Sequence, residues 1–74
     1  MARLPVVSGR DLIRALENTG YVVDRQKGSH IVLRQTAEPF RRVTVPDHKE
    51  IAKGTIRSIL RHTGLTTDEL LRLL

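Results

Sequence analysis

Histidine is the residue type most able to do chemistry in this chain, because the 74 residues include three histidines and no cysteine. The lack of cysteine excludes disulfides, Cys-ligated zinc, iron–sulfur clusters and a cysteine nucleophile. His30 stands out because it directly follows the run Lys27-Gly28-Ser29. An imidazole has an unperturbed pKa of about 6.5 and can therefore accept a proton near neutral pH. His30 is thus the candidate general base, although its pattern also fits an ordinary surface histidine in a strand.

The three residues before His30 have the properties of a phosphate-binding turn. Gly28 allows a ligand backbone to approach closely, and the N–H groups of the turn and the Ser29 hydroxyl can donate to a phosphate oxygen. The ammonium group of Lys27 can stabilise negative charge that develops on that oxygen. The alternative is that Lys-Gly-Ser is simply a hairpin turn, and only the adjacent histidine favours a functional role.

A second group of candidate phosphate ligands lies around the start of a predicted helix. A helix start offers unsatisfied N–H groups and the positive end of the helix dipole, and Lys53 and Arg57 stand one turn apart beside it. A solvated helix face is an equally good interpretation for each lysine taken alone. The group comprises Lys49, Lys53, Thr55 and Arg57.

The other two histidines are His48 and His62. His48 could be a second titrating group or the acid for a leaving oxygen, but a turn histidine bonded to the backbone is an equal alternative. His62 falls in the last turn of a predicted helix, where the dipole favours it as a cap. No two of the three histidines have metal-ligand spacing on one element, so we expect neither a metal site nor a cofactor.

The charge of the chain is positive and concentrated in its middle. The formal net charge is +5, and residues 25–61 hold nine Lys and Arg against three Asp and Glu. The partner is therefore expected to be anionic, either nucleic acid or an acidic protein. The length predicts one domain over residues 1–74. No stretch resembles a membrane span or a signal peptide, so we expect a cytoplasmic protein without a membrane partner.

The middle of the chain has the two-residue period of β-strands. The predicted strands are residues 21–27, 30–35 and 41–45. Gly28-Ser29 makes the turn between the first two, and Pro46-Asp47 stops the third. This order predicts a three-stranded antiparallel meander.

Helical spacing occupies both ends of the chain. Ser8 and Asp11 form a capping-box pattern that begins a helix over about 9–19. A second helix follows Gly54-Thr55 and ends before Gly64, and Thr66 with Glu69 begins a short leucine-rich helix. Those leucines either close the core or rest on another chain. The predicted fold class is α+β, with the helices on one face of the sheet.

Strand alternation predicts which side chains reach the open face of this sheet. If Ile31 and Leu33 face the helices, then His30, Val32 and Arg34 point away from them. By the same reasoning Arg42 and Thr44 join them from the third strand. The open face is then basic, with His30 at its edge beside the Gly28 turn.

The chain resembles the HicA-type mRNA interferase toxins over roughly residues 8–70. The resemblance rests on Arg25-Gln26-Lys27-Gly28-Ser29-His30, on Val45-Pro46-Asp47-His48, and on Lys53-Gly54-Thr55-Ile56-Arg57-Ser58-Ile59-Leu60 followed by Thr63-Gly64-Leu65. It implies a fold like the double-stranded RNA-binding domain, metal-independent mRNA cleavage by one catalytic histidine, and neutralisation by a HicB-type antitoxin. His30 matches that catalytic histidine, with Lys27, Gly28 and Ser29 in support. The expected RNA-binding residues are Arg25, Arg34, Arg42, His48, Lys49, Lys53, Thr55 and Arg57.

Two alternatives stay open at this point. One is a non-catalytic RNA-binding module with the same basic face, and the other is an interaction protein whose basic surface binds an acidic partner. Tyr21 and Phe40 are the only aromatic residues. Their scarcity disfavours recognition of splayed single-stranded bases by stacking.

Overall fold

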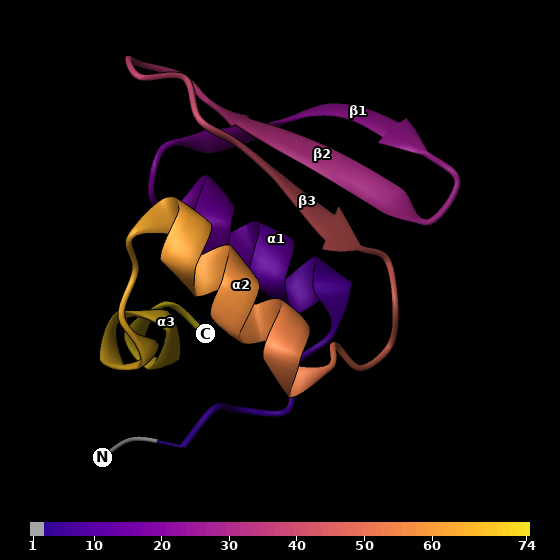
Figure 1. The fold of residues 1–74 in the computed structure, drawn as a ribbon, viewed down its shortest axis with the longest axis vertical. Coiled ribbons are helices and arrows are strands. Elements are labelled where there is room, and N and C mark those ends of the chain that lie inside the picture. The colour runs from indigo at the N-terminus through magenta and orange to yellow at the C-terminus, as the bar shows by residue number, and fades with distance from the viewer. Residues whose placement is uncertain (1–2) are drawn as a thin grey trace.

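The computed structural model describes residues 3–74 and has three strands between its helices (Figure 1). The elements are, in chain order, α1 Gly9–Glu17, β1 Tyr21–Lys27, β2 His30–Gln35, β3 Arg42–Pro46, α2 Lys53–Thr63 and α3 Thr67–Leu73. The predicted α+β order with a short terminal helix is therefore confirmed. None of the helices within residues 3–74 is long and apolar enough to cross a membrane.

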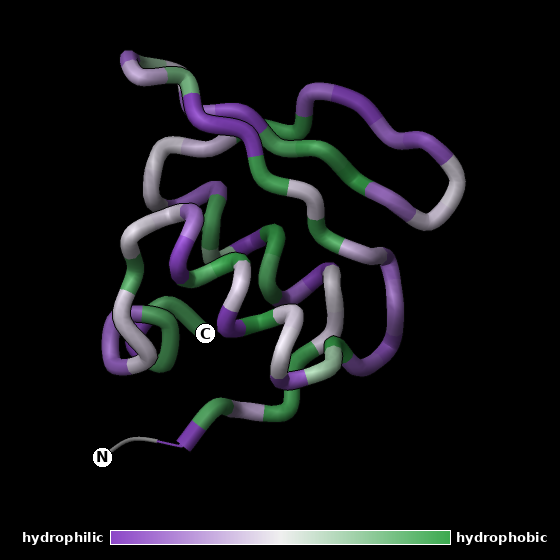
Figure 2. The backbone as a smooth tube through the Cα atoms, in the orientation of Figure 1, coloured by the Kyte–Doolittle hydropathy of each residue, from purple (hydrophilic) through white to green (hydrophobic). Residues whose placement is uncertain are grey.

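The three strands form one antiparallel sheet in the order β1-β2-β3. In β2 and β3 the side chains alternate as the two-residue period predicts. Ile31, Leu33, Val43 and Val45 are buried and belong to the same core cluster as the apolar faces of α1 and α2. Figure 2 shows the contrast with β1, which is apolar where it begins and hydrophilic towards its end.

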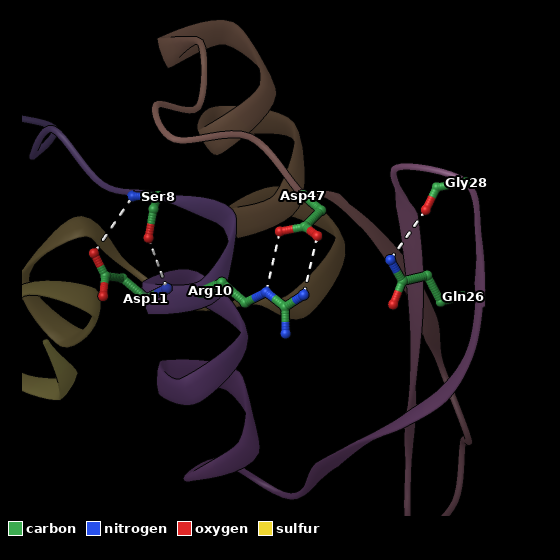
Figure 3. Close-up of polar contacts among 6 residues, drawn as sticks. All are labelled: Ser8, Arg10, Asp11, Gln26, Gly28 and Asp47. Carbon is green, nitrogen blue, oxygen red and sulfur yellow. Dashed lines mark hydrogen bonds and ion pairs between the residues drawn. The ribbon is translucent and has the colours of Figure 1, made fainter.

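The capping box of α1 forms as predicted, but the helix ends two residues earlier than expected. The Ser8 hydroxyl accepts from the Asp11 N–H at 3.1 Å, while the Ser8 N–H donates to the Asp11 carboxylate at 3.4 Å (Figure 3). At the other end, the N–H and the hydroxyl of Thr19 both donate to the Leu16 carbonyl. These bonds tighten the last turn, and Gly20, with a φ of 96°, turns the chain into β1.

The end of α2 and the start of α3 lie at their predicted signals, whereas α2 begins at Lys53, before the Gly54-Thr55 pair that was expected to precede it. Gly64 has a φ of 76° and donates its N–H to the Leu60 carbonyl, which closes α2 in the left-handed conformation. Thr66 and Glu69 form the second capping box at the start of α3. Leu70 of α3 is fully buried, whereas Leu71 and Leu74 remain 40% and 48% exposed. Only part of the leucine cluster therefore closes the core.

The start of α1 packs against the end of β3. The Gly9 N–H donates to the His48 carbonyl at 2.9 Å, and a side chain at Gly9 would overlap the Pro46 carbonyl oxygen. Pro46 was predicted to stop β3 but is its last residue. The strand tolerates it because the neighbouring Asp47 N–H donates the bond to β2, reaching the Ser29 carbonyl, so the proline nitrogen falls on the free edge.

Candidate nucleic-acid interface

The face of the sheet that points away from the helices is a grid of three cross-strand rows. Each row contains one residue from each strand, because direct cross-strand partners project to the same side. The first row holds two arginines, the second row holds one, and the third row holds the candidate histidine. The rows are Val22, Arg34 and Arg42; then Arg25, Val32 and Thr44; then Lys27, His30 and Pro46.

A β-bulge in β1 brings Arg25 and Lys27 onto this face. Val23 pairs with Leu33, but the next pair is Arg25 with Val32, so one residue of β1 is left over. Without the bulge, a strict alternation from buried Tyr21 would direct Arg25 and Lys27 towards the helices. The extra residue reverses which face of the sheet the following side chains of β1 point to. The predicted basic residues beside His30 therefore share its face.

His30 begins the central strand and pairs with Lys27 on one side and Pro46 on the other. Its side chain and that of Lys27 are exposed, as are Gly28 and Ser29 in the turn between them. Gly28 has a φ of 59°, a conformation that glycine adopts without the strain that a side chain brings. An exposed imidazole, an ammonium group and an open turn thus meet at one corner of the sheet.

The turn that precedes His30 is held in place from both sides. The Gln26 side-chain amide donates to the Gly28 carbonyl at 3.0 Å (Figure 3). On the other side, the Ser29 carbonyl accepts from the Asp47 N–H. Asp47 in turn accepts two hydrogen bonds from the Arg10 guanidinium, at 3.1 and 3.0 Å. These hydrogen bonds, followed by the charge of Asp47, raise the pKa of Arg10 above its ordinary value. The corner that carries His30 is therefore tied to α1.

Asp24, the bulged residue of β1, is an acidic member of the face that sequence reasoning missed. Its carboxylate lies 3.9 Å from Arg34 Nε and 3.8 Å from an Arg42 terminal nitrogen. Arg34 and Arg42 are direct cross-strand partners, so Asp24 offsets the repulsion between two like charges. The predicted basic face is consequently partly neutralised at the end that lies away from His30. No sequence signal located the bulge that places Asp24 there.

The predicted phosphate site at the start of α2 is separate from the His30 corner. Residues 47–52 connect the two, and Figure 1 shows α2 beginning well away from the β1–β2 turn. Ala52 provides no side-chain cap, so the first N–H groups of α2 lack a capping partner. Lys49 and Arg57 are exposed and Thr55 is half-buried. The Lys53 ammonium bonds the Leu4 carbonyl at 3.3 Å, a contact that the sequence did not predict.

The remaining histidines occupy different surroundings. His48 is exposed in the loop after β3, two residues beyond the cross-strand partner of His30, and its backbone carbonyl accepts from Gly9. His62 bonds the Ser58 carbonyl through Nδ1 at 2.8 Å, in the last turn of α2. Within residues 3–74, no three His, Asp or Glu side chains are grouped so that they could hold a metal ion.

Helices on one face of a three-stranded antiparallel sheet, with a basic open face opposite, define an α+β protein with the double-stranded RNA-binding-domain type of fold. The family model for the HicA toxin of bacterial toxin–antitoxin systems matches residues 9–65. The chain therefore belongs to the HicA toxin family. It is the toxin of a toxin–antitoxin pair, and a cognate antitoxin is its partner. No curated protein matched the sequence.

Proposed function

We propose that this toxin is an mRNA interferase, an endoribonuclease that cleaves mRNA in the cytoplasm without a metal ion and acts as one domain over residues 1–74. The observation that carries the proposal is the corner formed by His30, Lys27 and the Gly28-Ser29 turn. A general base must reach the proton that it removes, and an exposed imidazole at the rim of a basic face is accessible to RNA. Membership in a toxin family is compatible with a nuclease at this corner, and the basic face supports RNA as its substrate.

In the proposed reaction His30 removes the proton from the 2′-hydroxyl beside the scissile phosphate. The 2′-oxygen then bonds to phosphorus, and the bond from phosphorus to the 5′-oxygen breaks. The products are a 2′,3′-cyclic phosphate and a fragment that begins with a 5′-hydroxyl. The departing 5′-oxygen takes a proton from solvent or from His48, which lies in the adjacent loop. General-base catalysis typically contributes 10² to 10⁴-fold, in keeping with a slow nuclease.

Lys27 and the turn support this reaction electrostatically. Lys27 and His30 are cross-strand partners, so the ammonium group stands beside the base on the same face. The Ser29 hydroxyl and the backbone N–H groups of the turn stabilise the oxygens of the phosphate as negative charge develops on them. Arg25, Arg34, Arg42 and the start of α2 bind phosphates further along the RNA, and a HicB-type antitoxin keeps the enzyme inactive.

The test is cleavage of a long transcript by the purified toxin in excess chelator, followed by analysis of the fragment ends. We expect cleavage to persist, with cyclic phosphate and 5′-hydroxyl ends. A His30→Ala protein purified in parallel controls for contaminating ribonucleases. A requirement for added Mg²⁺ would contradict the mechanism. Binding of the transcript without cleavage would instead favour a non-catalytic RNA-binding module.

A further inference from the structure

A polar groove lies between strand β3 and helix α2, outside the His30 corner. Its volume is about 320 Å³, and the buried side chains of Val43 and Ile59 form its floor. Its walls carry polar groups from both elements. These are Arg42 and Thr44 of β3, and Thr55, Ser58 and His62 of α2.

The strand that borders this groove is an unpaired edge of the sheet. Two hydrogen bonds between β2 and β3 show which backbone groups of β3 face β2. The Gln35 N–H donates to the Arg41 carbonyl, and the Asp47 N–H donates to the Ser29 carbonyl. In an antiparallel pair the bonding residues alternate, so residues 41, 43, 45 and 47 face β2. The N–H and C=O groups of Arg42 and Thr44 therefore point outwards, along the groove. Within residues 3–74 these four groups have no backbone partner outside the sheet.

The opposite edge of the sheet is less suited to accept another strand. β1 carries the bulge at Asp24, which interrupts its pairing pattern, and it ends in charged residues. Bulges and charges are the usual means by which a sheet edge avoids further pairing. β3 has no bulge, and α2 beside it provides a second wall. An edge strand next to a helix is a known geometry for capturing an extended peptide.

The charge of the groove indicates the sign of its occupant. Its lining residues include Arg42 and no Asp or Glu, and the chain has a formal net charge of +5. The Arg42 guanidinium itself lies on the open face of the sheet, 3.8 Å from Asp24. His62 donates through Nδ1 to the Ser58 carbonyl, so in the neutral imidazole Nε2 can accept a hydrogen bond, for example from a backbone N–H. Three hydroxyl groups complete the polar wall. An extended segment with acidic side chains is complementary to this surface, in shape and in charge.

We propose that the cognate antitoxin adds an acidic extended segment to β3 as a fourth strand of the sheet, seated against α2. Its backbone pairs with the outward groups of Arg42 and Thr44, and its acidic side chains accept from the hydroxyl groups of Thr55 and Ser58 on α2. This inference rests on the antitoxin partnership of the family and does not depend on His30 being the catalytic base. Such a segment would hold the antitoxin on the toxin without using the residues of the His30 corner.

Thr44 offers the first test, because its N–H points away from β2. Thr44→Pro removes that donor without breaking a ladder bond, and proline is tolerated on a free edge. We expect the Kd for the purified cognate antitoxin to rise about tenfold, the cost of one lost backbone hydrogen bond at the upper end of the usual range. Thr44→Val keeps the N–H and removes only the hydroxyl, so it is the matched control and should bind much more tightly than Thr44→Pro.

Ser58 provides a test that leaves the strand untouched. Ser58→Glu places a carboxylate in the groove and should raise the Kd for the antitoxin about tenfold, whereas Ser58→Lys, of similar bulk, should not weaken binding. Thermal melts of each variant check that it is folded. Unchanged affinity in both Thr44→Pro and Ser58→Glu would overturn the proposal. Equal losses of antitoxin affinity in Ser58→Glu and Ser58→Lys would overturn the inference that the bound segment is acidic.

RNA binding by the same variants separates this inference from the proposed function. The expected result is that Ser58→Lys cleaves the transcript like the wild type. Loss of RNA affinity with unchanged antitoxin affinity would show that the groove binds RNA and would overturn the strand-addition proposal. A wild-type toxin that binds its antitoxin but never cleaves RNA would refute the proposed nuclease activity and leave this test intact.

Discussion

Lys27 and His30 are direct cross-strand partners at the closed end of the β1–β2 hairpin, separated in the chain by only the two turn residues. Side chains in such pairs have Cβ atoms about 5 Å apart and lie on one face of the sheet. Both are exposed, and neither belongs to the hydrophobic core. Chemistry and folding are therefore expected to be separable at this corner.

His30→Ala should abolish transcript cleavage while changing the free energy of unfolding by no more than about 0.5 kcal/mol, as is usual for exposed positions. His48→Ala is the comparison and should reduce cleavage less. Cleavage assays and thermal melts of both proteins make the measurement. Full activity in folded His30→Ala would transfer the role of base to His48, and an unfolded His30→Ala would mean that the side chain supports the fold.

The salt dependence of RNA affinity should report the phosphate contacts at the start of α2. Lys53→Ala and Arg57→Ala should weaken binding for all sequences and flatten the plot of log affinity against log salt by about one unit each. Arg72→Ala, in the exposed part of α3, removes the same charge and should leave the slope nearly unchanged. If the RNA affinity does not vary with salt, the basic surface binds an acidic partner rather than RNA.

Asp24→Asn should strengthen RNA binding. The carboxylate now lies within 4 Å of Arg34 and Arg42, so its removal frees two guanidinium groups for phosphate. Each added phosphate contact steepens the salt dependence by about one unit. Glu38→Gln removes one negative charge from the loop between β2 and β3 and serves as the control. Equal effects of the two substitutions on RNA affinity would mean that Asp24 acts only through the net charge of the protein and not through its contacts with the two arginines.

Gly9→Ala and Gly54→Ala should change stability in opposite directions. A methyl group at Gly9 would overlap the Pro46 carbonyl oxygen, so we expect a loss of about 1–3 kcal/mol. Gly54 lies in the first turn of α2 with nothing within 4 Å of an added Cβ. Alanine there should stabilise the protein by up to about 1 kcal/mol. Denaturant unfolding of both variants gives the two values, and tolerance of alanine at Gly9 would contradict the close packing of α1 on β3.

The two capping boxes should make stability sensitive to acid. Bonds from the Ser8 side chain, then from Arg14, lower the pKa of Asp11 below its ordinary 3.8, and bonds from Thr66 lower the pKa of Glu69 below its ordinary 4.5. Because each folded-state pKa lies below the unfolded value, this stability is complete above the unfolded values and is lost as the pH falls through the folded ones. As the pH drops below about 4, Tm should therefore decrease. Asp11→Asn with Glu69→Gln should weaken that dependence, and an unchanged profile would exclude the caps as its source.

Local patterns were enough to predict the order of elements and most of their ends. Ser8 and Thr66 begin their helices through bonds to residues three positions later, and Gly64 ends α2 through a bond to Leu60. Such signals act within one helical turn, so the chain carries them wherever it folds. The alternation that buries Ile31 and Val45 is equally local, because a strand reverses its side chains at every residue.

Tertiary structure decided which residues share the open face of the sheet. The bulge at Asp24 is set by the register between β1 and β2, and it turns Arg25 and Lys27 to the side of His30 while placing a carboxylate between two arginines. The Arg10–Asp47 pair joins residues 37 positions apart, and the outward edge of β3 exists because no fourth strand covers it within residues 3–74. Register, ion pairing across the fold and free edges depend on how separate segments meet. The sequence by itself therefore determined the elements and the candidate base, while their packing determined the charges that surround that base.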